Sequence, residues 1–383
     1  MDAKGQIFTF ENDHNPPFIV ALKGAEELGK KIDNYLVNWY NRDMGTDYKS
    51  FLVSNACPRF NSGDAKGLIN ESVRGKDLYI IVDVGNYSCT YKMFGELNRM
   101  SPDDHYADLK RIIAAIGGKA KSLTVIMPCL YGGRQHKRSM RESLDAATML
   151  QELEAMGVRG IITFDAHDPR VQNAVPLMGF DNFMPNYQIL KALLNKHPDL
   201  KFDKDHFMIV SPDEGAMQRN IYYSSLLKVD LGMFYKRRDY STVIDGRNPI
   251  VAHEYIGNPV MGMDIFVADD IIATGDSVLR LAEDLKQAGA GRIFLSTTYA
   301  LFTEGIDAFN KAYKEGLIEN VIGTNLTYLR PELADEPWFI EADMSKYIAY
   351  IISAFNQNKS VSSLLEPHDK ITELFAKYKV TLG

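Results

Sequence analysis

The sequence is poor in features that would each point to a particular class of protein. It contains only three cysteines, Cys57, Cys89 and Cys129, and none of them forms a CxxC pair. This argues against a disulfide framework or a cysteine metal site and favours thiols in a reducing cytosol. The formal net charge is −7, so we do not expect general binding to nucleic acid or to an anionic membrane, both of which are negatively charged.

Long apolar segments are also missing. No apolar run approaches the ~20 residues that a membrane span requires. The first residues, MDAKGQIFTFENDHNPPF, lack the basic and apolar regions of a secretory signal. We therefore expect a cytoplasmic protein that associates with neither membranes nor nucleic acid.

Apolar strands alternate with amphipathic helices along the 383 residues. Asp77–Val84, Ser122–Pro128 and Gly160–Asp165 are short, apolar and rich in β-branched residues, as buried strands are. Arg141–Gly157 has a helical pattern that ends at a glycine. The second half repeats this rhythm after a break near Asn186–Asp205. We predict an α/β fold with two tandem, mainly parallel sheets that helices flank.

Ligands of open α/β sheets bind beyond the carboxyl ends of the strands, so the loops after strands are the first candidates for a site. The apolar stretch Asp264–Ala268 is followed by Asp269 and Asp270, a turn at Ala273–Ser277 and a helix. Backbone N–H groups and hydroxyls at a helix start bind anions, and paired carboxylates accept from hydroxyls or hold hydrated Mg²⁺. A phosphorylated sugar has both features; helix capping with solvated acids is the alternative.

Two further loops carry acids or histidine. His167 follows a predicted strand, where it suits a divalent metal or acid–base chemistry, and a surface histidine held by Asp168 is the alternative. Asp213 follows the strand that begins at Phe207, and a capping role for Ser211 or Asp213 would account for it equally.

Two basic segments also follow predicted strands, at Arg134–Arg138 and at Lys236–Arg238. Their charge suits a polyphosphate, because Arg binds phosphate oxygens in pairs and Lys acts as a point charge. Either segment alone could be a solvated loop. Both occur with the acidic loops in an otherwise acidic protein, and this combination favours a bound polyphosphate with a metal ion.

Six stretches, the five loops above and a segment that begins at Arg59, lie in order between Arg59 and Pro367 and resemble the motifs of the ribose-phosphate diphosphokinases, or phosphoribosyl pyrophosphate synthetases. They are RFNSGDAKGLINESVRGKDLYII, GGRQHKR, FDAHDP, VSPDEGA, YKRRD and VADDIIATGDS. The resemblance implies an enzyme of nucleotide biosynthesis that uses Mg²⁺. It transfers the diphosphoryl group of ATP to the anomeric hydroxyl of ribose 5-phosphate, and AMP is the second product.

The resemblance also implies a role for each matched residue. Lys236 and Arg238 would stabilise the transferring phosphates, and His167 and Asp213 would bind the metal. The ribose 5-phosphate would be held by Asp269, Asp270, Thr274, Gly275, Asp276 and Ser277. ATP would be held by Phe60, Ser62, Asp64, Arg134 and Gln135.

Four positions depart from the family pattern and identify a divergent member. Ala273 stands where the family has an acid, Asp276 replaces a glycine, Ser62 replaces an acid of the adenine turn, and His136 stands where an Asp is usual. Two alternatives therefore stay open, a catalytically weak regulatory paralogue of a synthetase and a phosphoribosyltransferase.

The resemblance further implies two phosphoribosyltransferase-like domains. The ATP side would cover residues 1–185, joined by a C-terminal helix and tail at 341–383, and the ribose 5-phosphate side would cover 186–340. Because a neighbouring subunit completes the adenine site in the family, we expect a homo-oligomer, either a dimer or a hexamer.

Overall fold

The computed structural model describes residue 10 and residues 15–138, 140–238 and 250–380, with the backbone alone at 236–238 and 250–253. The chain divides into two compact units. The first comprises Met1–Pro185, Asn325–Tyr328 and Asp343–Asp369, and the second comprises Asn186–Thr324, Leu329–Ala342 and Lys370–Gly383.

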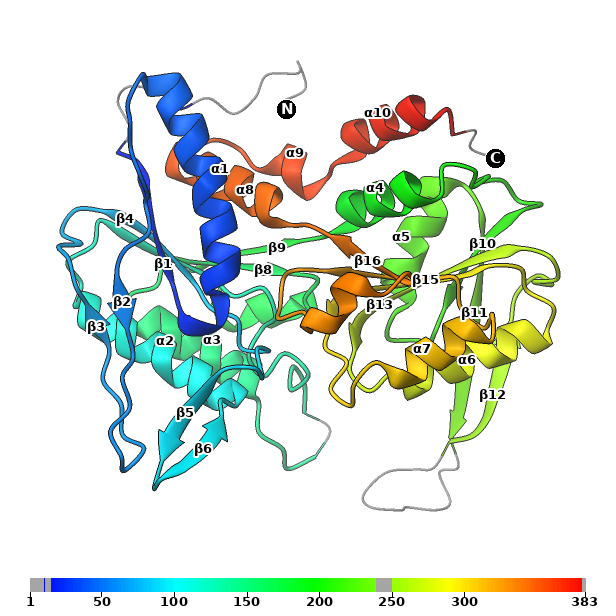
Figure 1. Cartoon of the computed structure of the whole chain (residues 1–383), viewed down its shortest axis with the longest axis horizontal. Coiled ribbons are helices and arrows are strands. Elements are labelled where there is room, and N and C mark those ends of the chain that lie inside the picture. The colour runs from blue at the N-terminus through cyan, green and yellow to red at the C-terminus, as the bar shows by residue number, and fades with distance from the viewer. Residues whose placement is uncertain (1–9, 11–14, 139, 239–249, 381–383) are drawn as a thin grey trace. The chain divides into compact units, whose positions relative to one another are not determined.

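The first unit is built on a five-stranded parallel sheet in the order β1-β4-β7-β8-β9. Its strands are β1 (Pro17–Ala21), β4 (Asp77–Ile81), β7 (Ser122–Ile126), β8 (Gly160–Phe164) and β9 (Gly179–Phe183). Two helices cover each face (Figure 1): α1 (Glu26–Met44) and α8 (Ser345–Asn356) on one, α2 (Pro102–Ile116) and α3 (Asp145–Ala155) on the other. Short helical segments lie at η1 (Lys23–Ala25), η2 (Pro169–Ala174) and α9 (Ser362–Leu365).

Two small antiparallel ribbons extend from the first unit. One pairs β2 (Asn55–Ala56) with β3 (Leu68–Ile69), and the other is a hairpin of β5 (Thr90–Met93) and β6 (Glu96–Arg99). The hairpin was not predicted from the sequence, because each of its strands is only four residues long and mostly polar.

The second unit contains a seven-stranded sheet in the order β12-β11-β10-β13-β14-β15-β16, parallel except for β12. Its strands are β10 (Phe207–Ser211), β11 (Asp230–Arg238), β12 (Ile250–Ile256), β13 (Asp264–Ile272), β14 (Ile293–Ala300), β15 (Asn320–Thr324) and β16 (Phe339–Ala342). One face carries α4 (Asn186–Lys196), α5 (Met217–Leu227) and α10 (His368–Tyr378). The other carries α6 (Asp276–Gln287), α7 (Asp307–Lys314) and η3 (Pro331–Asp335).

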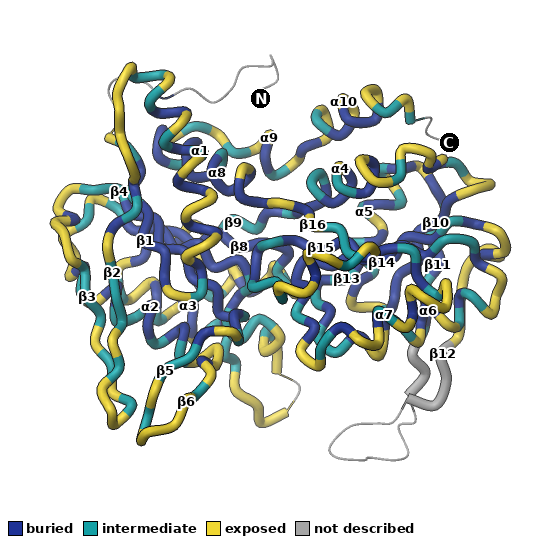
Figure 2. Tube along the Cα trace, viewed as in Figure 1, coloured by how far each residue is buried: buried dark blue, intermediate teal, exposed yellow. Residues whose placement is uncertain are grey.

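The strands alternate their side chains between two cores. In β10, Phe207 and Ile209 pack with α4, α5 and α10, whereas Met208 and Val210 face the α6 and α7 side. Figure 2 shows the sheet strands as mostly buried and the outer faces of the helices as exposed. The predicted α/β class, with mainly parallel sheets flanked by helices, is confirmed.

The C-terminal region differs from the prediction that all of residues 341–383 join the first unit. The helix α8 does belong to the first unit, but most of α10 belongs to the second. The physical reason is its apolar stripe, because Ile371, Leu374 and Phe375 are buried in the same core as Phe202 and Phe207.

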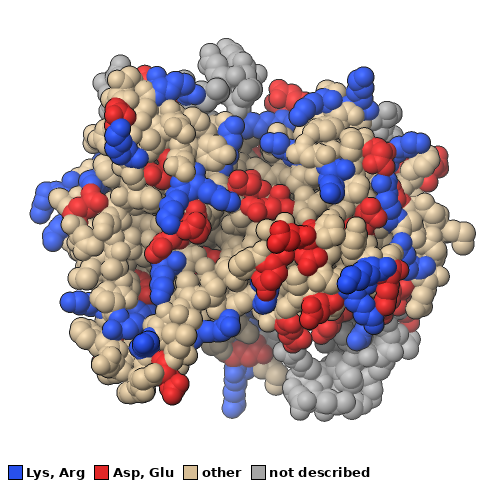
Figure 3. All heavy atoms as spheres, in the orientation of Figure 1, with Lys and Arg blue, Asp and Glu red and all other residues tan. Residues whose placement is uncertain are grey.

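The surface carries both charges. On the face drawn in Figure 3, Lys and Arg side chains are interspersed with Asp and Glu side chains. Among the described residues, no helix is both long enough and apolar enough to cross a membrane.

Candidate functional site

The acid pair of the second unit lies within a strand, not after it as predicted. β13 continues to Ile272, and Asp269 pairs with Thr297 of β14. The backbone N–H of Asp270 donates to the Asp269 carboxylate at 2.8 Å, and the Arg219 guanidinium lies 3.9 Å from that carboxylate. Burial and the negative charge of Asp270 raise the pKa of Asp269, and Arg219 opposes this. Two acids in this setting favour a ligand that donates hydrogen bonds or carries positive charge.

The turn after β13 requires its glycine. Gly275 has a φ of +96°, and a Cβ built on it would lie 2.4 Å from Cε2 of Phe309. Gly275 is also the N-cap residue of α6, so the N-cap position has no side chain to cap the helix, and the Thr274 hydroxyl accepts from the Asp276 N–H at 3.4 Å. The structure therefore does not show the capping by Asp or Ser that was the alternative interpretation of this loop.

Side chains around this helix start shape what it can bind. The Thr274 hydroxyl donates to the Asp276 carboxylate at 3.2 Å, and Asp276 and Ser277 are both exposed. The first N–H groups of a helix and the positive end of its dipole attract anions. The exposed Asp276 carboxylate repels an anion at the same place, in contrast to the glycine of the family pattern.

Asp213 orders the loop between β10 and α5. Its carboxylate accepts from the backbone N–H of Ala216 at 3.1 Å, and the Ser211 hydroxyl donates to its carbonyl oxygen at 2.8 Å. The loop therefore has a local hydrogen-bonded turn, as the capping alternative expected. One carboxylate oxygen of Asp213 takes part in this turn.

The basic segment at Lys236–Arg238 lies in a strand, so the prediction of a loop is wrong for its backbone. β11 pairs antiparallel with β12, with Lys236 opposite His253 and Arg238 opposite Ile250, and the register shifts between Arg237 and Arg238. The sequence predicts that the strand ends with its last apolar residues, but backbone hydrogen bonds to β12 continue the strand beyond them. The side chains of Lys236 and Arg238 lie outside the described residues.

In the first unit, the predicted adenine turn is a closed loop. The backbone N–H of Phe60 donates to the Asp64 carbonyl at 2.7 Å, and the N–H of Gly63 donates to the Phe60 carbonyl at 2.9 Å. The Ser62 hydroxyl donates to the Asp64 carboxylate at 2.8 Å. Ser62, a departure from the family pattern, thus orients the remaining acid of the turn. The Phe60 side chain is 54% exposed, which leaves an aromatic face open to a ligand.

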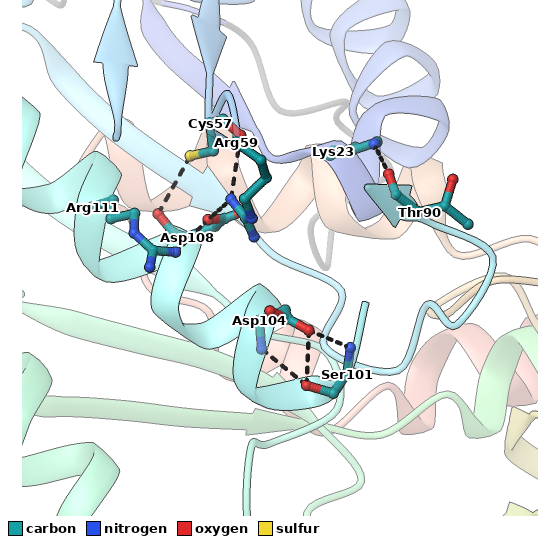
Figure 4. Close-up of polar contacts among 8 residues, drawn as sticks. All are labelled: Lys23, Cys57, Arg59, Thr90, Ser101, Asp104, Asp108 and Arg111. Atoms are coloured by element: carbon teal, nitrogen blue, oxygen red, sulfur yellow. Dashed lines mark hydrogen bonds and ion pairs between the residues drawn. The ribbon is translucent and has the colours of Figure 1, made fainter. Parts of the chain in front are cut away.

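A buried ion pair anchors this turn, and no sequence pattern predicted it. The Arg59 guanidinium donates to both carboxylate oxygens of Asp108 in α2, at 2.7 and 3.0 Å, and Arg111 donates to the same carboxylate at 2.8 Å (Figure 4). Burial lowers the pKa of Arg59, but the hydrogen bonds and charge of Asp108 outweigh it and raise the pKa. No local pattern signals such a pair, because its partners are 49 positions apart.

The predicted ATP-phosphate residues lie in the turn after β7. Arg134 and Gln135 are exposed, and the Gln135 N–H donates to the Gly132 carbonyl at 2.8 Å. The next residue, His136, brings its ring to 5.3 Å from that of His167 and its Nε2 to 3.5 Å from the Asp168 carboxylate. The substitution of His for Asp therefore places a second imidazole beside the predicted metal ligand.

Asp168 has a stronger partner than histidine. Arg170 donates to its carboxylate at 2.6 Å, and these hydrogen bonds are the main reason that the pKa of Asp168 is lowered to about 2. The acid therefore stays ionised beside His136 at neutral pH.

The two predicted metal ligands belong to different units, His167 to the first and Asp213 to the second. Among the described residues, no group of three or more His, Cys, Asp or Glu side chains could hold a metal ion. So small a number of protein ligands is compatible with Mg²⁺, which is usually bound by one or two carboxylates, keeps several waters and completes its shell with substrate phosphates.

Comparison with known proteins identifies the family. Residues 18–157 match the N-terminal domain of ribose phosphate pyrophosphokinase. The ribose-phosphate pyrophosphokinase of Shewanella oneidensis is 30% identical over 312 residues, which cover 80% of this chain and 89% of that protein. The protein of the same name from Vibrio parahaemolyticus is 28% identical over the same coverage.

A solved structure agrees with this assignment. The phosphoribosylpyrophosphate synthetase of Mycobacterium smegmatis superposes with a TM-score of 0.71 over 90% of this chain and all of that chain, at 19% identity. This likeness shows the fold, and the sequence relatives show the family. The chain belongs to the ribose-phosphate pyrophosphokinase family.

Proposed function

We propose that the chain is an ATP-dependent diphosphotransferase that converts ATP and ribose 5-phosphate to phosphoribosyl pyrophosphate and AMP. The observation that carries this proposal is the end of β13, where Asp269 and Asp270 precede a glycine turn and the start of α6, whose N-cap residue is Gly275. A phosphorylated sugar offers vicinal hydroxyls to the acids and a phosphate to the helix start.

On the ribose side, the acid pair binds and orients the sugar. Hydroxyl donors stabilise the ionised carboxylates, which burial and mutual repulsion otherwise disfavour. Thr274, Gly275 and Ser277 hold the 5-phosphate through hydroxyl and backbone N–H groups. The anomeric hydroxyl is thereby held in one orientation, and such positioning contributes much of the rate enhancement in phosphoryl-type transfer.

On the ATP side, the exposed Phe60 ring stacks with the adenine, and Asp64 accepts from its exocyclic amine. Arg134 and Gln135 bind the phosphates, and Lys236 and Arg238 stabilise the charge that develops during transfer. His167 and Asp213 would hold Mg²⁺ together with the phosphates, and the bound ion would supply positive charge that neutralises part of the charge on the transferring group.

The direct test incubates the purified chain with ATP, MgCl₂ and ribose 5-phosphate and separates nucleotides by ion-exchange chromatography. We expect AMP and phosphoribosyl pyrophosphate in equal amounts, and no AMP when ribose 5-phosphate is omitted. Absence of AMP with retained ATP binding would instead identify a regulatory paralogue, a function that the exposed carboxylate of Asp276 at the phosphate cradle favours. Consumption of phosphoribosyl pyrophosphate with a free base would identify a phosphoribosyltransferase.

We also propose that the protein works in the cytoplasm as a homo-oligomer, a dimer or a hexamer. None of Cys57, Cys89 and Cys129 forms a disulfide, which fits a reducing compartment. Light scattering at assay concentration tests the assembly, and a fully active monomer would contradict it.

A further inference from the structure

The β5–β6 hairpin ends in an exposed aromatic residue held in an unfavourable backbone conformation. Its two-residue loop is Phe94 and Gly95, with φ values of +52° and +85°. Positive φ at both positions is what a tight hairpin turn of this kind requires, and Asn, Asp or Gly is the usual residue at the first. Phe94 is 76% exposed, so packing within the unit does not explain why a large side chain occupies this position.

The base of the hairpin is fixed to the rest of the first unit (Figure 4). The Lys23 ammonium donates to the Thr90 carbonyl at 2.6 Å, and the Arg59 guanidinium lies 5.0 Å from the centre of the Tyr91 ring. After the hairpin, Ser101 and Asp104 form a capping box that begins α2. These contacts hold the hairpin in one orientation, as a binding surface requires.

The tip of the hairpin contacts the predicted adenine turn. The backbone N–H of Phe94 donates to the Asn61 carbonyl at 2.9 Å. The Met93 side chain lies against Gly63, where an added Cβ would come within 2.5 Å of the Met93 sulfur. The turn and the hairpin tip therefore form one continuous surface, which carries the exposed rings of Phe60 and Phe94.

A cavity of about 490 Å³ opens at this junction, lined by Asn61, Ser62, Lys92, Phe94 and Gly95. Its aromatic side chain offers a stacking face for a planar base. The Lys92 ammonium has only donors to offer and suits the acceptor nitrogens of a heteroaromatic ring. Asn61 and Lys92 also line a second cavity of about 460 Å³ on the inner side of the hairpin, next to Arg59.

We infer that the hairpin tip forms a second wall of the nucleobase site, in which Phe94 stacks on the base of the diphosphoryl donor and Lys92 donates to a ring nitrogen. Both residues determine donor affinity and base preference. This inference rests on the proposed function and adds to it two residues that lie outside the six motifs. The ligand class is a purine nucleotide.

The test measures binding without turnover. Isothermal titration calorimetry with α,β-methylene-ATP, whose α–β bridge cannot be cleaved, gives the Kd for the wild type and for Phe94→Gly. Loss of a stacking aromatic typically weakens base binding by about 5- to 150-fold, and we expect a rise in Kd of that size. Phe94→Tyr should retain affinity, and Lys92→Met should weaken it. Leu97→Ala is the matched control, because Leu97 is 66% exposed on the same hairpin but lines neither cavity.

Stability separates a binding role from a structural one. Glycine adopts positive φ without strain, so Phe94→Gly should unfold at the same temperature as the wild type or higher while its Kd rises. An unchanged Kd would overturn the inference. A changed oligomeric state by light scattering with unchanged Kd would identify the tip as a subunit contact instead. AMP formation by the wild type tests the proposed function independently of these variants.

Discussion

Removing one partner of the Arg59–Asp108 pair should strongly destabilise the first unit. Asp108→Ala deletes both oxygens that accept from Arg59 and leaves a guanidinium whose side chain is only 8% exposed. Breaking a buried pair in this way typically costs ~3–5 kcal/mol. The Cys57 carbonyl at 3.3 Å and the Tyr91 ring remain as partners of Arg59, so we expect the lower end, about 3 kcal/mol.

Thermal and urea unfolding measure this loss. For a domain of this size, about 3 kcal/mol corresponds to a fall in Tm of roughly 6–12 °C. Arg111→Ala is the control on the same carboxylate. Its side chain is 32% exposed, and such a contact is worth about 1 kcal/mol or less. A fall in stability of less than about 1 kcal/mol for Asp108→Ala would refute the argument that the Arg59 charge is buried and depends on Asp108.

A double variant separates stability from function. Arg59→Met with Asp108→Leu removes both charges, and replacement of a buried pair by apolar residues is often close to neutral for stability. Because Arg59 leads directly into the turn at Phe60–Asp64, we expect the double variant to remain folded but to show a raised KM for ATP. A double variant that matches the wild type in both respects would mean that the pair does not position the turn.

Three further predictions follow from other sites. The buried carboxyl of Asp83 accepts from the Thr327 hydroxyl at 2.9 Å, and burial raises its pKa to about 6. Its stabilising contribution is therefore complete below about pH 4 and is lost as the pH rises through about 6, with a full range of about 3 kcal/mol. Between pH 5 and pH 7.5, urea unfolding should show the stability of Asp83→Asn rising relative to the wild type by roughly 1–1.5 kcal/mol, and equal pH profiles would contradict this. In Gly275→Ala the new Cβ has to be accommodated at a φ of +96° and against the Phe309 ring, so we expect the free energy of unfolding in the same assay to fall by about 2–4 kcal/mol. A fall below about 1 kcal/mol would mean that the turn relaxes. Lys236→Ala should lower kcat for AMP formation by about two to three orders of magnitude with little change in KM for ribose 5-phosphate, while Asp269→Ala should raise that KM. A wild-type kcat in the Lys236→Ala variant would mean that Lys236 is not a catalytic residue.

Local patterns in the sequence were enough to predict the fold class. Buried parallel strands are apolar on both faces, and amphipathic helices repeat every 3.6 residues, so both are visible in short windows. The strand from Phe207 and the helix that ends at Gly157 could be predicted for this reason. The turn at Gly275 was also visible, because a glycine between a strand and a helix is typical of a tight turn that needs a positive φ.

Contacts between distant segments were decided only by the tertiary structure. Asp108 lies 49 positions from Arg59, and Thr327 lies 244 positions from Asp83, so neither pairing leaves a periodic signal in the sequence. Likewise, β11 extends through Lys236 because a partner strand supplies hydrogen bonds there, although the local composition indicates a loop. Hydrogen bonds and ion pairs of this kind depend on where the chain returns in space, and the pattern of neighbouring residues does not encode that return.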